Sequence, residues 1–164
     1  MRAAENVMLA GPLSSQMLPI SEVQVEWNPD DGKLAQLESL YGRRGSLAIP
    51  RSGSAEDETE TYRKTLSLLR EAFALSYSPW QQLGVKTIIS DWLEKIPRGF
   101  LDLLGERRPK ALILLAHLAC LLKRAEHFWY MKGAGERIVS TILISVGEEW
   151  LDWIQWPLEV MGMN

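Results

Sequence analysis

The sequence predicts an all-α protein, folded as a compact bundle of about five to six helices with an irregular N-terminal arm. Two observations predict the bundle: apolar residues recur at helical spacing after residue 55, and the connections between the helical stretches are short. A third is a central stretch that is apolar on nearly every side, as a buried helix is. We therefore expect residues 1–55 to form an arm and linker with one short helix, and residues 56–164 to form a helical domain.

The first 55 residues have no sustained period. The stretch "VQVEWNPDDG" alternates like a short strand and ends in a turn signal. Residues 33–40 predict a short helix that is closed by Gly42, and "GRRGSLAIPRSGSAEDE" is typical of a linker. Before about residue 20 we expect a mobile arm, because no periodic apolar face is present there.

The first long helix of the domain is expected from about residue 56. Ser54 can cap its N-terminus, and the acids that follow suit the positive end of the helix dipole. An apolar stripe at intervals of four, three and four residues marks its core face. The stripe consists of Tyr62, Leu66, Leu69 and Phe73.

Five further helices are predicted on the same grounds. The second covers about residues 82–95, and a short third covers residues 99–105. The fourth opens with Pro109, a favoured first helical residue, and continues to about residue 126 as the buried central helix. A fifth runs through "FWYMKGAGERIVSTILISV", and the last, "EEWLDWIQW", begins with acids and stops before Pro157.

Composition limits the classes of function. The net charge of −3 and pI near 5.5 argue against a general nucleic-acid binder, which needs a basic face. The single cysteine, Cys120, can form neither an internal disulfide nor a cysteine metal cluster, so a reducing, intracellular setting is expected. The longest apolar run, Ala111–Leu122, is shorter than the roughly 20 residues that span a bilayer. We expect no membrane span, no bound metal, no cofactor and a cytoplasmic protein.

Few side chains suggest catalysis. His117 and Cys120 share a face of the central helix, but two ligands do not make a metal site, so a hydrogen-bonded core histidine is the favoured interpretation. The alternative is that His117 is a general acid or donates to a ligand carbonyl. Glu148, Glu149 and Asp152 suit the dipole of a first turn better than an acid–base pair. The "GAG" at residues 133–135 lies in a helical pattern, which excludes a dinucleotide loop.

Aromatic residues are the unusual feature, since six of the seven tryptophans follow residue 79. Core filling is favoured for most of them, and the alternative is that some line an apolar pocket, with Met131 as an adaptable wall. The aromatic residues concerned are Trp80, Trp92, Trp129, Tyr130, Trp150, Trp153 and Trp156.

The segment "GERRPKALILLAHLACLLKRAEHFWYMKGAGERIVSTILISVGEEWLDWIQWPLE" resembles the C-terminal end of the regulatory domain of fungal zinc-cluster transcription factors, including the sterol-sensing subgroup. That ending has an "RRP-ALxLLAHxAxLLxR" helix, a "WYxxGW" helix and an "EEW…W…WP" element, which correspond to residues 107–124, 129–133 and 148–157. The resemblance covers about a third of the chain well, and about two thirds more weakly when the earlier helices are included.

Two departures from that family matter. Its DNA-binding module uses six cysteines and this chain has one, and the upstream part of the usual regulatory domain is absent, so a stand-alone domain is expected. The tryptophan that the family pattern places after Gly133 is Ala134 here. Exchanging an indole for a methyl group removes volume, so we expect an apolar cavity near Ala134, bordered by Trp129, Tyr130 and His117.

Two hypotheses follow. The first is a domain that binds a hydrophobic polycyclic molecule, terpenoid or sterol-like, and acts as a cofactor-free cyclase, isomerase or Diels-Alderase-like pericyclase of fungal natural-product biosynthesis, through preorganisation and a hydrogen-bond donor. The alternative is a non-enzymatic, truncated ligand sensor or transcriptional regulator without DNA binding, which would be nuclear. The small helical half favours a homodimer under either hypothesis.

The first hypothesis assigns specific residues. The candidate catalytic donors are His117 and Tyr130. The candidate ligand-binding residues are Trp129, Tyr130, Met131, Ala134, His127, Trp150 and Trp153.

Overall fold

The computed structural model describes residues 28–42, 53–78 and 84–163, with side chains of the second range from residue 57. Within these ranges every regular element is a helix, and no strand is present. The all-α prediction is therefore confirmed. The expected mobile arm, most of the linker, Trp80 and the alternating residues before Asn28 lie outside the described ranges.

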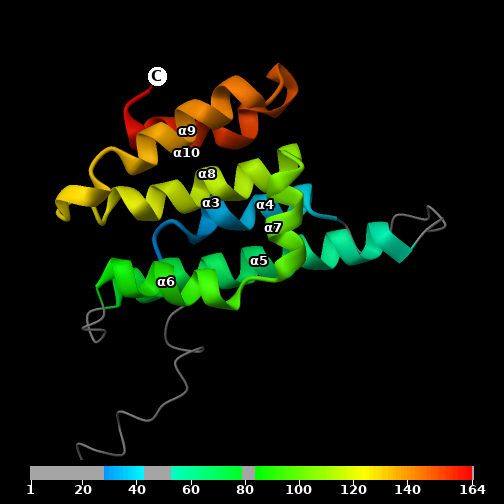
Figure 1. Ribbon diagram of the computed structural model, residues 1–164, viewed down its shortest axis with the longest axis horizontal. Helices are drawn as coiled ribbons and strands as arrows, with labels where there is room; N and C mark the ends of the chain where they lie inside the picture. The colour runs from blue at the N-terminus through cyan, green and yellow to red at the C-terminus, as the bar shows by residue number, and fades with distance from the viewer. Residues whose placement is uncertain (1–27, 43–52, 79–83, 164) are drawn as a thin grey trace, which may run out of the picture.

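From α6 onward the elements follow one another with short connections (Figure 1). In chain order the elements are α3 Asp31–Ala35, α4 Leu37–Leu40, α5 Gly53–Tyr77, α6 Val85–Lys95, α7 Arg98–Gly105, α8 Pro109–Lys123, η3 Trp129–Met131, α9 Ala134–Ser145, η4 Glu148–Ile154 and α10 Gln155–Met161, where η denotes a 3-10 helix.

Helix α8 is the centre of the bundle. In Figure 1 it lies between α9 and α10 on one side and α5 and α6 on the other, and it contacts all four. Eleven of its 15 residues are buried, as expected for a helix that is apolar nearly all round. Pro109 stands at its first position, where the missing N–H has no intrahelical partner to lose.

Helix α5 packs on this centre through the predicted stripe. Tyr62, Leu66, Leu69 and Phe73 are all at most 3% exposed. Thr65 is buried beside them, and its hydroxyl is satisfied there because it donates to the Thr61 carbonyl one turn earlier, at 2.7 Å. The period of the sequence thus identified the core face of this helix.

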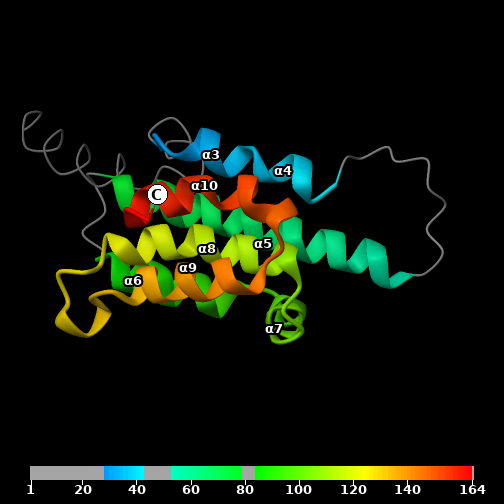
Figure 2. The same ribbon diagram turned by 90° about the horizontal axis from the view of Figure 1, so that it is seen from above.

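The short helix predicted in the N-terminal part is formed by α3 and α4, which lie along one face of the bundle (Figure 2). Leu34, Leu37 and Tyr41 are at most 1% exposed. The Tyr41 hydroxyl donates to the Lys110 carbonyl at 2.8 Å, which joins this segment to the start of α8. Residues 31–41 are therefore part of the core, and the domain boundary near residue 55 stays a prediction.

Several helix boundaries differ from the prediction: α5 begins at Gly53 and α8 ends at Lys123, each about three residues earlier than expected. Two further differences have a clear backbone cause. The fifth helix does not run from Phe128: residues 129–131 form a 3-10 turn, and α9 begins only at Ala134, because Gly133 adopts a left-handed conformation with φ of 73°. The last helix does not stop before Pro157. Pro157 is the third residue of α10, in the first turn, where a backbone N–H needs no intrahelical acceptor.

Within the described ranges, each helix falls short of the length and apolar character that crossing a bilayer requires.

Candidate functional site

The imidazole of His117 is held inside α8 and is only 2% exposed. Its Nδ1 lies 2.8 Å from the Ile113 carbonyl oxygen, which can only accept, so Nδ1 carries the proton and donates. Burial lowers the pKa of His117 to about 4. The ring is therefore neutral near pH 7, and its remaining nitrogen, Nε2, is an acceptor rather than the acid that a general-acid role requires.

Cys120 lies one turn further along α8 and is also buried. Its Sγ is 3.7 Å from the Ala116 carbonyl oxygen, and burial raises the pKa of the thiol. A protonated thiol is a poor nucleophile and a poor metal ligand. Across residues 28–42, 57–78 and 84–163, no group of three or more His, Cys, Asp or Glu side chains is arranged to hold a metal ion.

His117 forms part of the floor of a groove between the α3–α4 face and the η4–α10 segment, which we call the His117 groove. Its volume is about 210 Å³. The His117 ring lies 5.6 Å from the Trp156 ring, centroid to centroid, and Trp153 is a second aromatic wall. The groove is further lined by Lys33, Gln36, Leu37, Asp152, Gln155 and Glu159.

Only some of the site residues predicted from the sequence therefore lie in one place. His117 and Trp153 line the same groove, and Trp150 is half-buried against the core on the same 3-10 helix as Trp153. Trp92 belongs to the core, where its ring meets Phe100 edge-on at 6.2 Å.

The remaining candidates lie at the turn between α8 and α9. We call residues 127–133 the aromatic tip. Trp129 is 87% exposed and Tyr130 is 45% exposed, His127 is also exposed, and Met131 is half-buried. Trp129 and Tyr130 thus face solvent and do not border the buried His117. Their role in ligand binding stays a prediction.

The glycine after Ala134 shows how this turn continues into α9. A Cβ on Gly135 would lie 3.0 Å from the Ala119 carbonyl oxygen and 2.9 Å from the Met161 methyl carbon. At these distances a Cβ would clash, so α8, α9 and α10 pack closely at Gly135 because its side chain is only a hydrogen atom. Ala134 itself is half-buried. Beside it, the small residue at position 135 serves close helix packing.

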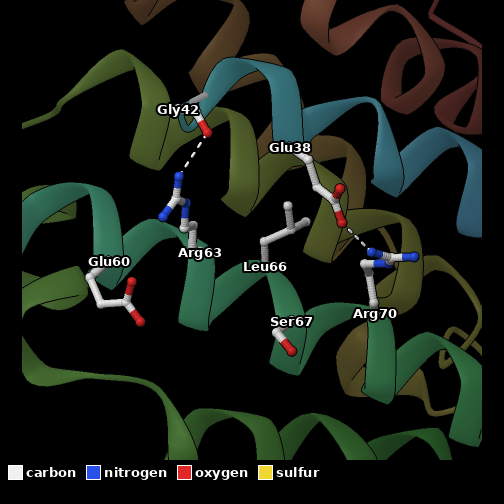
Figure 3. Close-up of a pocket in the computed structure, with 7 residues that line it drawn as sticks. All are labelled: Glu38, Gly42, Glu60, Arg63, Leu66, Ser67 and Arg70. Carbon is white, nitrogen blue, oxygen red and sulfur yellow. Dashed lines mark hydrogen bonds and ion pairs between the residues drawn. The ribbon is translucent and has the colours of Figure 1, made fainter. Parts of the chain in front are cut away.

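A larger groove lies between α4 and α5, and sequence reasoning missed it (Figure 3). It has a volume of about 460 Å³, and we call it the α4–α5 groove. Leu66 is its one large apolar side chain. The lining residues are Glu38, Gly42, Glu60, Arg63, Leu66, Ser67 and Arg70.

The two arginines of the α4–α5 groove are engaged in its walls. Arg63 donates to the Gly42 carbonyl oxygen at 2.9 Å. Arg70 forms a bidentate pair with Asp31, at 2.7 and 2.6 Å, and a further ion pair with Glu38. This arrangement fastens α3 and α4 to α5. The spacing of the α5 residues could have indicated one polar face, but the α4 residues that complete the groove come from a separate part of the chain.

Comparison with known proteins connects the chain to one class of regulator. Over 71 residues, which are 42% of this chain, it is 31% identical to a protein described as a Zn(2)-C6 fungal-type transcription factor from Gibberella zeae. The matched part is 14% of that protein's length. No family model matches the chain, and no solved structure matches it. The similarity supports a relation to fungal zinc-cluster regulators.

Proposed function

We propose that this chain is a non-enzymatic regulatory module related to the fungal zinc-cluster transcription factors. The observation that carries the proposal is the 31% identity over 71 residues to such a factor. The chain has one cysteine, whereas the zinc-cluster module that the resemblance implies uses six. The thiol of Cys120 is also buried and protonated, so this chain does not supply that module's ligands.

The proposed mode of action is contact with another regulator or with a ligand. DNA recognition then rests with a protein or segment that carries the cysteines, because the net charge of −3 gives no general affinity for phosphate. Such a module works inside the cell, and in the nucleus when it is bound to a DNA-binding partner.

A hydrophobic ligand, terpenoid or sterol-like, remains part of the proposal, and the His117 groove is where we place it. That groove has two tryptophan walls and the apolar Leu37, but most of its other lining residues are polar or charged: Lys33, Gln36, Asp152, Gln155 and Glu159. The tryptophan walls are what favour it over the α4–α5 groove, whose lining has no aromatic residue. Its volume of about 210 Å³ is below the roughly 300–1,000 Å³ of pockets that bind drug-sized molecules. A polycyclic ligand would therefore have to move α3 away from α10.

The cyclase hypothesis has less support from the geometry. Its two candidate donors do not converge on one pocket: the Nδ1–H of His117 is used by the Ile113 carbonyl, and Tyr130 lies on the aromatic tip. Preorganised catalysis needs donors aimed at the same reacting group.

A reporter assay tests the proposed function. The chain is fused to a heterologous DNA-binding domain, and expression is measured from two reporters that carry that domain's binding sites. One reporter has low basal expression, which reveals activation, and the other has high basal expression, which reveals repression. We expect the fusion to change expression several-fold on one of them. The fusion carrying Leu121→Asp, which places a charge in the core, is the unfolded control. A folded fusion that behaves like the DNA-binding domain alone on both promoters would contradict the proposal.

A further inference from the structure

The aromatic tip projects at one end of the bundle, between α8 and α9 (Figure 1). Burying large aromatic side chains is favourable, and an exposed tryptophan at 87% is unusual beside the buried core of the same chain. Residues of this type dominate the energy of protein interfaces when they insert into a partner. The tip is therefore the first surface to consider for a partner.

The rings of the aromatic tip form an open corner. The Trp129 and Tyr130 rings are 5.8 Å apart at an angle of 89°, and both are exposed. Phe128 is half-buried and lies 5.7 Å from the Tyr130 ring. The two rings stand edge to face, and their exposed faces meet at a right angle, so one apolar side chain of a partner could contact both.

Hydrogen bonds and an ion-pair network hold the tip in place. The backbone N–H of Gly133 donates to Glu126 at 3.1 Å, and the other oxygen of Glu126 pairs with Lys123 at 3.1 Å. Lys123 also pairs with Glu136, and its hydrogen bond lowers the pKa of that carboxyl. A preorganised tip loses little conformational entropy when it binds.

The charges around the tip are mostly positive. The Lys86 ammonium lies 5.4 Å from the centroid of the Tyr130 ring, and Lys132 and Arg137 are exposed. The nearby carboxylates of Glu126 and Glu136 are both paired with Lys123. The chain as a whole has a charge of −3, so this end differs in sign from the rest. Charge complementarity therefore indicates an acidic partner.

We propose that the aromatic tip binds an extended peptide segment in which acidic residues alternate with large apolar ones, the composition of disordered activation segments. One apolar side chain fills the corner between Trp129 and Tyr130, and flanking carboxylates meet Lys86, Lys132 and Arg137. This inference deepens the proposed function, on which it rests, by naming the class of partner.

The exposed apolar area favours a peptide over a membrane. Among the apolar side chains of the tip, Trp129 is almost fully exposed, while Phe128 and Met131 are half-buried. Membrane-surface segments bury a continuous apolar face into the bilayer. One indole beside one half-exposed phenol is enough for a side chain but supplies no such face.

The test uses the purified full chain and a fluorescein-labelled synthetic peptide of 16 residues that alternates Glu or Asp with Phe or Leu, read by anisotropy. We expect a Kd on the order of 100 μM or tighter and a loss of about tenfold or more in Trp129→Ala. Exchanging the peptide's acids for lysines, or raising the salt from about 0.1 M to about 0.5 M, should weaken binding several-fold.

Ile144→Ala is the matched control, because Ile144 is also 87% exposed but sits near the other end of α9. Its Kd should equal that of the unchanged chain. Four results would each overturn the inference: no binding at about 1 mM peptide; equal weakening in both variants; Trp129-dependent binding to phosphatidylcholine–phosphatidylserine vesicles without peptide binding; or Trp129-dependent self-association without peptide binding. A reporter effect with no peptide binding would remove this inference and leave the proposed function standing.

Discussion

The stretch from residue 127 to residue 137 contains two regions that behave in opposite ways. In the first, large aromatic residues face solvent, with Trp129 at 87% exposed. In the second, Gly135 lies so close to the Ala119 carbonyl and to Met161 that a Cβ would be 3.0 Å or less from both. Within the described residues, five positions separate the most exposed tryptophan, Trp129, from the tight junction of α8, α9 and α10 at Gly135.

The difference shows that residue type alone does not decide burial. Gly133, with φ of 73°, turns the chain between the two regions and lets α9 start in a new direction. Gly135 then allows α9 to approach α8 and α10 closely. Trp129 and Tyr130, which precede Gly133, remain exposed. The contribution of each region to stability should differ accordingly.

Among substitutions between residues 127 and 137, Gly135→Leu should have the largest effect on stability. The new side chain must displace the Ala119 backbone or the Met161 side chain, and overpacking of this kind costs about 2–3 kcal/mol. The free energy of unfolding, measured by urea denaturation followed by circular dichroism, should fall by that amount.

Gly105→Leu is the matched control for this prediction. Gly105 ends α7, and no heavy atom lies within 4 Å of a Cβ placed on it. The change should alter the free energy of unfolding by less than about 0.5 kcal/mol. Equal effects at positions 105 and 135 would show that the α8–α9 junction is looser than described.

A pH titration tests the burial of His117, which is 2% exposed. An unfolded histidine has a pKa of about 6.5, and burial lowers that of His117 to about 4. The unfolded chain therefore binds this proton first as the pH falls. The stabilising contribution is complete above about pH 6.5 and is lost as the pH falls towards 4, which amounts to about 2 kcal/mol between pH 7 and pH 5.

His117→Gln removes the titrating group, so the difference in free energy of unfolding between pH 7 and pH 5 should shrink by about 2 kcal/mol. The unchanged chain, measured in parallel, supplies the reference difference. Comparing differences rather than absolute stabilities removes any cost of the substitution itself. A pH difference that is the same in His117→Gln and in the unchanged chain would contradict the burial of a neutral His117.

Much of the fold could be predicted from the sequence, because it depends on local period. The stripe of Tyr62, Leu66, Leu69 and Phe73 identified the buried face of α5, and the continuous apolar run identified α8 as the central helix. Such patterns report which side of a helix is apolar, and burial of that side stabilises the bundle.

The site could not be predicted in the same way. Which tryptophans are buried depends on how distant elements pack, and the sequence carries no period for the aromatic tip. Gly133 was included in a continuous helix, although its left-handed backbone ends the turn. The grooves likewise join α3 or α4 to residues far along the chain, such as Trp153. The resemblance to fungal zinc-cluster regulators is carried by the sequence motifs between residues 107 and 157, and the comparison supports it, but no site geometry points to it.

The smallest expected effect on stability is that of Trp129→Ala. Removing a side chain that is 87% exposed takes away little buried area, so the free energy of unfolding should change by less than about 0.5 kcal/mol. Trp92→Ala is the contrast, since Trp92 is 2% exposed and packs on Phe100, and it should cost about 3–5 kcal/mol. Urea denaturation of both variants measures the two values. A loss of 2 kcal/mol or more in Trp129→Ala would mean that the indole packs against the bundle, and the tip would then be a structural element rather than a surface available to a partner.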